Sequence, residues 1–456
     1  MSTFIGQTQS KFIRSEEELS DYFSRHIKSR NKLQVGLEAE FLGVHLSTGK
    51  ALPYEGPFGI HAVLKYLASH FGYEPVRENG NIIALSRGDN FISLEPGGQV
   101  ELSAPPVHNV FDMEHQIQAF FKELGECRKE MPDIGWLAYG IQPFSRLEEV
   151  SWVPKQRYAI LAEYMKPRGM LSHHMMKLTA TNQINLDYWS EDHAMMSLKV
   201  ALGITSMVSA FFANSPFSEG RPNGFLTRRL EIWNHTSPDR SGLIVEFTKE
   251  GLRFRDYLEY ILEMPLIFIV REEKWIAVGD RTFRQFIQKG FQGYQATLGD
   301  YELHLSTAFP EVRLKQYLEI RGMDGQSADM ICAAAAFWKG ILYDETALEL
   351  AWKLVSFASE TDRLELHRSV PREGLKATLG DRPILAIVRE LVEISCASLA
   401  RQGENEASRD ECTFLARIRE KLAKPGKSPA DILLEKWDKD LSKSPEALLD
   451  YLKAVP

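Results

Sequence analysis

Cysteine is scarce in this chain and follows no recognisable pattern. The 456 residues include four cysteines, Cys127, Cys332, Cys396 and Cys412, which lie far apart and form no C-x-x-C pair. Zinc sites need closely spaced Cys and His ligands, and disulfide frameworks are typical of short, cysteine-rich secreted chains. We therefore expect neither a zinc site nor a structural disulfide framework.

An excess of positive charge and the glycine-rich nucleotide motifs are missing as well. The net charge is -8 and the pI is about 5.9, whereas a nucleic-acid-binding surface needs an excess of Lys and Arg. The chain has neither a G-x-x-x-x-G-K-S/T loop nor a G-x-G-x-x-G turn after a strand. We expect no nucleic-acid partner, and any bound ATP must be held by metals and arginines.

Targeting and membrane segments are not evident either. Residues 1–14 lack the basic-then-apolar layout of a signal peptide, and three glutamates follow at positions 16–18. The most apolar window, residues 194–213, is interrupted by Lys199 and diluted by hydroxyl side chains. We therefore expect a cytoplasmic protein in which residues 194–213 form a buried helix and not a membrane span.

Hydrophobic periodicity predicts an α+β fold with a mainly antiparallel sheet, because helices and strands do not alternate regularly. Expected helices cover residues 15–30, 59–71, 111–130 and 158–164, and expected strands cover residues 33–44, 81–85, 91–95, 99–102, 134–141 and 178–186. After about Asp344 the pattern becomes almost wholly helical. This predicts one domain at residues 1–344, which the resemblance described below implies to be catalytic, and a helical C-terminal region at residues 345–456.

Four glutamates stand in or beside the predicted strands. Glu38 and Glu40 share one face of strand 33–44, while Glu95 and Glu101 flank the turn Pro96-Gly97-Gly98. A buried carboxylate needs a cation or hydrogen bonds, and Mg²⁺ prefers oxygen ligands. A solvated edge strand, or ion pairs with Arg or Lys, would explain the same residues.

Two further segments carry polar side chains on one face if they are extended. Residues 309–315 would align Glu311, Arg313 and Lys315, which suits a metal-bound triphosphate and equally a surface row of ion pairs. Strand 178–186 and the residue after it would form a polar floor or an exposed face. Its polar residues are Thr179, Thr181, Gln183, Asn185 and Asp187.

Arginines recur near aromatic residues, at Arg157-Tyr158, at Arg229 ahead of Trp233, and at Arg240. The planar guanidinium matches a carboxylate or phosphate in two-point contact, although any single arginine can simply be solvated. The isolated His304 could be a ligand, a proton carrier or a packed side chain.

Six segments, in order along residues 33–344, closely resemble the plant-type glutamate-cysteine ligases, a family that also occurs in bacteria. They are GLEAE at 36–40, LEPGGQVELS at 94–103, QINLD at 183–187, FANSPF at 212–217, GRPNGFL at 220–226 and FPEVRLK at 309–315. The resemblance implies a glutamine synthetase-like fold, in which an antiparallel sheet curves into a funnel and is flanked by helices.

The resemblance also implies roles for individual residues. The implied ligands of Mg²⁺, or of Mn²⁺, are Glu38, Glu40, Glu95, Glu101 and Glu311. The implied catalytic arginines are Arg157, Arg229 and Arg313. The implied substrate contacts are Arg157, Arg229, Trp233, Thr181, Ile267 and Arg240, and the implied nucleotide contacts are Gln183, Asn185, His304, Arg313 and Lys315.

The implied reaction is the ATP-dependent joining of the glutamate γ-carboxylate to the cysteine amine through a γ-glutamyl phosphate, the first step of glutathione biosynthesis. The implied partners are glutamate, cysteine and ATP, with no membrane, and the protein would be a monomer or a homodimer. The alternatives are a related ligase that uses another amine, a non-catalytic binding homologue and a metal-dependent hydrolase.

The chain departs from the family pattern at several places, among them Lys177 and Asn182 beside the polar strand, where nucleotide contacts would differ in detail. Where plant members read Pro-Met-Tyr, this chain has Pro265-Leu266-Ile267, which removes a hydroxyl group from the expected amino-acid pocket. Gln118 and Val278 stand at positions of plant redox cysteines, and only Cys332 is retained. We therefore expect no plant-style disulfide switch and full activity in the reduced protein.

Overall fold

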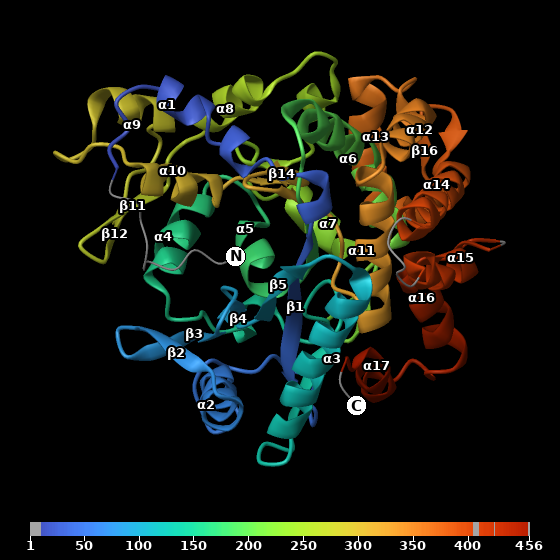
Figure 1. The fold of residues 1–456 in the computed structure, drawn as a ribbon. Coiled ribbons are helices and arrows are strands. Elements are labelled where there is room, and N and C mark those ends of the chain that lie inside the picture. Colours follow the sequence, from blue (N-terminus) through green and yellow to red (C-terminus); the bar gives the residue numbers. More distant parts are fainter. Residues whose placement is uncertain (1–10, 405–409, 424, 455–456) are drawn as a thin grey trace.

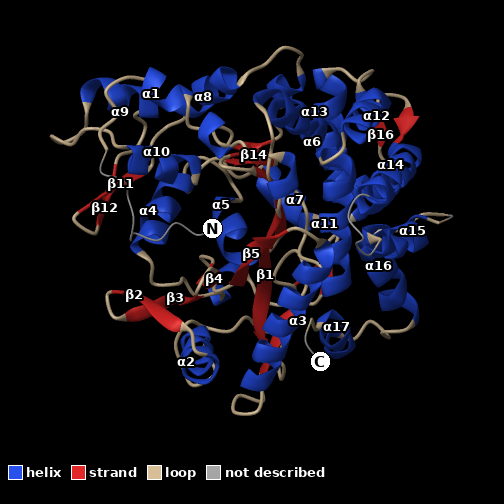
Figure 2. Ribbon diagram, in the orientation of Figure 1, coloured by secondary structure: helices blue, strands red, loops and turns tan. Residues whose placement is uncertain are grey.

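One sheet organises the protein. In the computed structural model, which describes residues 11–404, 410–423 and 425–454, nine strands form this sheet, and every neighbouring pair is antiparallel (Figures 1 and 2). The order is β14 (Val312–Leu314), β15 (Leu318–Ile320), β7 (Asn182–Leu186), β1 (Val35–His45), β5 (Val100–Val107), β4 (Asn90–Leu94), β3 (Asn81–Arg87) and β2 (Glu74–Glu78), and β6 (Ile134–Leu137) also pairs with β1. The predicted α+β fold is confirmed, while its funnel shape stays a prediction.

The long strand β1 lies at the centre of the sheet. Leu37, Ala39 and Phe41 face the hydrophobic core, so alternation turns Glu38 and Glu40 to the opposite face. Both glutamates are nonetheless buried, with 6% and 8% of their surface exposed. A solvated edge strand is thus excluded as the reason for these two carboxylates.

Helices surround the sheet in Figure 2. Between the strands lie α2 (Ile60–Phe71), α3 (Val110–Cys127), α4 (Gln156–Met165), α5 (Ser172–Leu178), α6 (Glu191–Phe211), α7 (Arg228–Asn234), α8 (Phe254–Glu263), α9 (Phe283–Lys289), α10 (Leu298–Leu305) and α11 (Ala328–Leu342). Short two-stranded pairs join the loops: β8 (Phe217–Ser218) with β9 (Arg221–Pro222), β10 (Ser241–Gly242) with β13 (Phe309–Pro310), β11 (Phe268–Arg271) with β12 (Lys274–Ala277), and β16 (Thr378–Leu379) with β17 (Arg382–Pro383).

The apolar window at residues 194–213 belongs to α6. Among the described residues this helix alone is long and apolar enough to cross a membrane, yet 94% of its most apolar window is buried inside the protein. It packs against α12 (Glu345–Val355) and α13 (Glu360–Glu373). The predicted buried helix is confirmed.

Two predicted elements differ from the structure. The helix expected at residues 15–30 is wrong: α1 covers only Glu17–Ser20, and 3₁₀ turns follow at Ser24–His26 and Arg30–Lys32. Tyr22 and Phe23 are buried in different aromatic contacts, so tertiary packing overrides the helical spacing. The strand expected from residue 178 begins later, because the Thr179 hydroxyl donates to the Met175 carbonyl oxygen (2.6 Å) and closes the last turn of α5.

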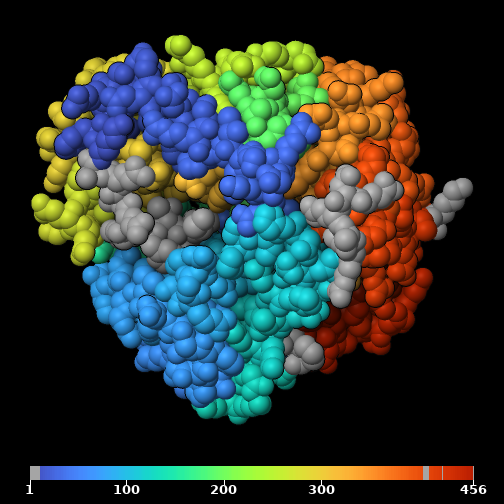
Figure 3. Space-filling model, viewed as in Figure 1, coloured from blue at the N-terminus to red at the C-terminus, as the bar shows by residue number. Residues whose placement is uncertain are grey.

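The residues after Asp344 are mostly helical, as predicted. They form α12, α13, α14 (Ile384–Glu404), α15 (Ala416–Leu422), α16 (Pro429–Lys439) and α17 (Pro445–Leu452), drawn in orange and red in Figures 1 and 3. Leu348, Leu366 and Leu391 belong to the same hydrophobic core cluster as the strands β1 and β5. The domain boundary at Asp344 stays a prediction.

One disulfide corrects the expectation drawn from the scarce cysteines. Cys396 of α14 is bonded to Cys412 of the 3₁₀ turn Glu411–Leu415, whereas Cys127 and Cys332 are free and buried. The two bonded cysteines are 16 residues apart, a spacing that matches no motif. Only the packing of the turn against α14 brings them together.

We expect the Cys396–Cys412 bond to stabilise the fold without controlling activity, because neither cysteine lies near the carboxylates of β1. Closing a loop of this length contributes roughly 3 kcal/mol. Reductant should therefore lower the thermal unfolding temperature of the wild type. The Cys412→Ser variant should unfold at the temperature of the reduced wild type, whether or not reductant is present. An unfolding temperature that reductant leaves unchanged in the wild type, or a loss of activity on reduction, would contradict this account.

Candidate functional site

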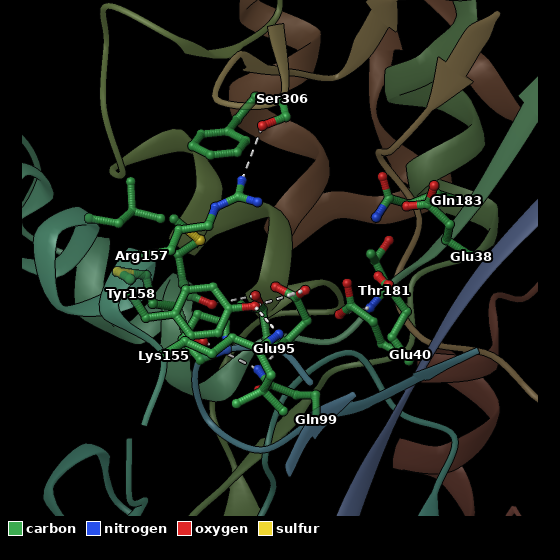
Figure 4. Close-up of a pocket in the computed structure, with 18 of the residues that line it drawn as sticks. Glu38, Glu40, Glu95, Gln99, Lys155, Arg157, Tyr158, Thr181, Gln183 and Ser306 are labelled. Carbon is green, nitrogen blue, oxygen red and sulfur yellow. Dashed lines mark hydrogen bonds between the residues drawn. The ribbon is translucent and has the colours of Figure 1, made fainter. Parts of the chain in front are cut away.

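A pocket lies over the face of the sheet that carries Glu38 and Glu40. Figure 4 shows Arg157 and Tyr158 of α4 on one side and Glu38 and Gln183 on the other. The structure brings ten of the predicted residues into its lining: Glu38, Glu40, Glu95, Glu101, Arg157, Thr181, Gln183, Arg229, Trp233 and Arg313.

The strand register creates the acidic wall of this pocket. Glu40 of β1 stands directly opposite Glu101 of β5, and Glu38 stands opposite Gln183 of β7. The Glu101 carboxylate accepts hydrogen bonds from Ser93 Oγ (2.7 Å) and Ser103 Oγ (3.1 Å). Like charges facing each other across two strands repel, so this register is unfavourable unless another charge compensates it.

Burial and mutual repulsion change the titration of the acidic wall. Burial, and then the carboxylates of Glu38 and Glu95, raise the pKa of Glu101 to about 7. Burial, and then Glu95 and Glu101, raise the pKa of Glu40 well above its ordinary value. Burial and the neighbouring carboxylates thus disfavour the ionised forms of Glu40 and Glu101 in this wall.

The acidic wall fits a divalent cation that shares its ligands with a phosphate. Carboxylate and amide oxygens are the donors that Mg²⁺ takes, and it is often held by one or two carboxylates together with substrate phosphates. Among the described residues, no group of three His, Cys, Asp or Glu side chains could hold a metal ion alone. The oxygens of Glu38, Glu40, Glu101 and Gln183 thus suit a cation whose shell the substrate completes.

The Pro-Gly-Gly turn holds Glu95 and is fixed from two sides. Gln99 accepts from the Gly97 backbone (2.9 Å) and donates to the Thr179 carbonyl oxygen (2.7 Å). Gly97 is required here, because a Cβ atom would lie 2.1 Å from the Lys177 carbonyl oxygen.

Lys155 and Tyr158 hold the strand end beside Glu95, and sequence reasoning gave them no role. Lys155 Nζ and the Tyr158 hydroxyl both donate to the Leu94 carbonyl oxygen, at 2.7 and 2.6 Å. Burial lowers the pKa of Lys155 to about 8. Their place within two residues of Arg157, with Lys155 as the N-cap of α4 and Tyr158 in its first turn, could have pointed to them.

The far wall carries guanidinium groups with free donors. Arg229 has 2% of its surface exposed and donates one hydrogen bond, to the Arg321 carbonyl oxygen (2.9 Å). Among the described residues, its Nε and Nη1 atoms and the Nε atom of Arg157 are buried without a partner. Buried donors are rarely left unpaired, so an anionic substrate group is the natural partner of these atoms.

Glu319 and Arg321 of the sheet edge were not identified from the sequence. Glu319 is completely buried, and its carboxylate pairs with Arg313 (2.5 Å) and Arg321 (3.2 Å), with Lys315 at 3.7 Å. Although burial alone would raise it, these three cations hold the pKa of Glu319 well below its ordinary value. Arg321 also donates to the Gln183 amide oxygen (2.5 Å), which links this cluster to the acidic wall.

The signal for this pair was present, because Glu319 and Arg321 alternate with Leu318 and Ile320. It is the same alternation that singled out Glu38 and Glu40.

Two predicted residues contact the pocket wall without lining it. Asn185 donates to the Glu38 carboxylate (3.3 Å), and Lys315 lies beside Glu319. Both therefore act through a neighbour in this structure.

The structure places four other predicted residues outside the lining. Glu311 lies 4.0 Å from His367 of α13, and Ile267 belongs to an apolar cluster with 1% of its surface exposed. His304 pairs with the Ile261 carbonyl oxygen (2.9 Å), and burial lowers its pKa to about 3. Arg240 donates to backbone oxygens of Thr307 and Pro265 and to the Tyr164 hydroxyl, so it ties loops together behind the pocket.

Comparison with known families identifies the class of protein. The model of glutamate-cysteine ligase family 2 matches residues 34–447, and the chain therefore belongs to this family. The match continues past Asp344 into the C-terminal helices.

Curated relatives agree over nearly the whole chain. The chain is 36% identical over 442 residues to the chloroplastic glutamate-cysteine ligase of Nicotiana tabacum, covering 95% of this chain and 83% of that protein. It is 35% identical over 441 residues to the chloroplastic enzyme of Arabidopsis thaliana, covering 96% and 83%. A solved structure, glutamate-cysteine ligase of Francisella tularensis in complex with AMP, matches with a TM-score of 0.56 and 12% identity over 92% of this chain and 87% of that chain, which shows a shared fold.

These relatives correct the predicted cytoplasmic location. The plant relatives are named as chloroplastic, so they do not support the predicted cytoplasmic location. The prediction rested on the first residues of the chain, of which residues 1–10 lie outside the described part.

We expect Glu101→Gln to stabilise the metal-free protein above pH 7. The Glu101 carboxyl has a folded pKa of about 7 against an ordinary value of 4.5, so the stability it contributes at low pH is lost as the pH rises through 7. Removing the charge should raise the free energy of unfolding at pH 8 by up to about 3 kcal/mol and change little below pH 4.5. Denaturant unfolding with a chelator present measures this.

Glu123→Gln is the matched control, because Glu123 is a buried carboxylate that accepts from Tyr73 (2.8 Å) and Arg87 (2.8 Å). It should lose stability at pH 8. If Glu101→Gln were equally destabilising, repulsion in the acidic wall would not be the dominant effect.

Proposed function

We propose that this protein joins the γ-carboxyl group of glutamate to the amine of cysteine, with conversion of ATP to ADP and phosphate, in the first step of glutathione biosynthesis. The observation that carries the proposal is the pairing of two walls in one pocket. A repelling set of carboxylates faces guanidinium groups whose buried donors have no partner. Such a pocket suits a reaction that brings metal-bound phosphates to an amino-acid carboxylate.

Glu38, Glu40, Glu95 and Glu101 would hold the divalent cations, with Gln183 beside them. Magnesium is the cation we propose, and manganese has the same preference for oxygen ligands. When bound, the cation neutralises the nucleotide phosphates and polarises the transferred phosphoryl group. The carboxylates themselves fix where the phosphates lie.

Arg229 and Arg157 would hold glutamate. Their unpaired donors can bind its carboxylates, and Trp233 closes the wall beside Arg229, with the guanidinium carbon 5.4 Å from its ring centre. Arg313 and Arg321 would face the phosphates, because Glu319 fixes both guanidinium groups at the end of the acidic wall.

The bond changes then follow. A γ-carboxylate oxygen of glutamate attacks the γ-phosphorus of ATP, and ADP leaves. The amine of cysteine, having lost a proton, attacks the acyl carbon of γ-glutamyl phosphate, and phosphate leaves with the oxygen that came from glutamate. Phosphoryl transfer depends on positioning and charge stabilisation, so no protein nucleophile is needed.

The relatives support this reaction, since the proteins from Nicotiana tabacum and Arabidopsis thaliana are named glutamate-cysteine ligases. The complex of the Francisella tularensis protein with AMP supports an adenine nucleotide as the phosphate source. We further propose that the protein acts as a monomer or a homodimer and requires no membrane or nucleic acid.

The choice of amine is the least constrained part of the proposal. Ile267 replaces the expected tyrosine of plant members, but it lies in an apolar cluster outside the pocket lining. The lost hydroxyl group thus gives no reason to prefer another acceptor.

The purified protein should release ADP and phosphate in equal amounts with ATP, Mg²⁺, glutamate and cysteine, and should form γ-glutamylcysteine. Arg313→Lys should lower kcat about 100-fold or more. The planar guanidinium group of Arg313 can pair with Glu319 and face a substrate in the pocket at the same time, and the ammonium group of lysine cannot. Coupled ADP detection and mass spectrometry of the product measure both results.

Other amino acids in place of cysteine provide the comparison. Rapid product formation with another amine and none with cysteine would identify a related ligase. Phosphate release that depends on neither amino acid would indicate a hydrolase, and no turnover with intact ATP binding would indicate a binding protein.

A further inference from the structure

Asp324 is a buried carboxylate directly behind the pocket wall. It follows β15 in the chain, has 1% of its surface exposed and does not line the pocket. Its Oδ2 atom accepts from the Asn214 backbone (2.7 Å) and from Ser215 Oγ (2.7 Å), and its Oδ1 atom accepts from Thr227 Oγ1 (2.8 Å). A buried carboxylate with this many donors is strongly held in one orientation.

The two hydroxyl donors begin helix α7. Thr227 is its N-cap and accepts from the Leu230 backbone (3.2 Å), while Ser215 Oγ accepts from the Arg229 backbone (3.1 Å). The Asp324 carboxylate therefore orients the Thr227 and Ser215 hydroxyl groups, and these accept hydrogen bonds from backbone N–H groups in the first turn of α7.

Helix α7 carries two residues of the pocket wall. Arg229 lies in its first turn and Trp233 one turn later, so their directions depend on the direction of the helix axis. Burial lowers the pKa of Arg229, and Asp324 is the foremost of the nearby carboxylates that oppose this effect. Asp324 thus acts on Arg229 through both geometry and charge.

Asp324 is held on its other side by the start of the polar strand. Thr181 and Asp324 form a β-bridge, and the Gly325 backbone donates to the Ala180 carbonyl oxygen (3.0 Å). Gly140 packs so closely that a Cβ atom there would lie 2.6 Å from Asp324 Cγ. These contacts hold the Asp324 backbone beside the pocket residue Thr181.

We propose that Asp324 is a positioning residue for amino-acid binding: it fixes the direction of Arg229 and Trp233, and so sets the affinity of the pocket for glutamate and not for the nucleotide. The inference rests on the proposed function, in which Arg229 holds glutamate. The acidic wall and Arg313, which would hold the nucleotide phosphates, have no hydrogen bond to Asp324 among the described residues.

Asp324→Asn tests this inference because it keeps the shape of the side chain and removes its charge. The amide nitrogen must face at least one of the three donors, so the negative charge is lost and at least one hydrogen bond is broken or, at a hydroxyl group, reversed. We expect KM for glutamate to rise about tenfold or more, with KM for ATP within about twofold of the wild type. Calorimetry of glutamate binding with magnesium and a non-hydrolysable ATP analogue should show the same loss of affinity.

Two controls separate positioning from general loss of stability. Glu123→Gln removes a comparable buried carboxylate whose partners lie outside the pocket, and it should change neither KM. Thr227→Ser keeps the hydroxyl group that donates to Asp324, so it should behave like the wild type. Thr227→Ala removes this hydroxyl group and should raise KM for glutamate. This pair decides the matter if Asp324→Asn fails to fold.

Equal increases of both KM values, or an effect of Glu123→Gln as large as that of Asp324→Asn, would overturn the inference. A wild-type protein that does not ligate glutamate would refute the proposed function instead. In that case a crystal structure of Asp324→Asn still decides the geometric claim: reoriented Arg229 and Trp233 side chains would support it, and unchanged ones would overturn it.

Discussion

The repulsion between Glu40 and Glu101 is the constraint on which the site depends. Antiparallel pairing of β1 and β5 sets these two carboxylates directly opposite each other, and both are buried. Burial raises the pKa of both groups, and the charge of Glu101 adds to the shift at Glu40. In the proposed function, a positive charge that arrives with the substrate offsets this pair.

The remaining strands and helices bring arginine side chains of this chain to the same pocket. On β15, Glu319 balances Arg313 and Arg321, so these cations are fixed in place and only partly neutralised. Next to Arg321, whose carbonyl oxygen accepts from Arg229, α7 brings Arg229 into the pocket with donors that have no partner among the described residues. A nucleotide with its cation can therefore bind between the two walls, and a dicarboxylate amino acid can bind against the arginines.

Local patterns predicted one wall well and the other poorly. Alternation along β1 singled out Glu38 and Glu40, because strand periodicity depends on the chain alone. The facing of Glu40 and Glu101 depends on sheet order and register, and the Cys396–Cys412 bond depends on a packed turn. Neither is visible in a single sequence, since distant segments decide both.

Family resemblance placed residues near the site without showing which side chains reach it. Arg240 and His304 stand at family positions, yet both side chains form hydrogen bonds with backbone carbonyl oxygens outside the pocket lining. Conversely, Glu319 and Arg321 follow the same alternation as Glu38 and Glu40. They were missed because their strand is three residues long, too short for periodicity to stand out.

In the proposed reaction the pocket activates glutamate as an acyl phosphate, and oxygen labelling follows this step. Glutamate carrying ¹⁸O in its γ-carboxylate would be turned over with ATP and cysteine, and the released phosphate analysed by mass spectrometry. Each phosphate should carry one ¹⁸O atom, because the bridging oxygen leaves with phosphorus. Unlabelled phosphate, released while the peptide forms, would rule out the acyl phosphate.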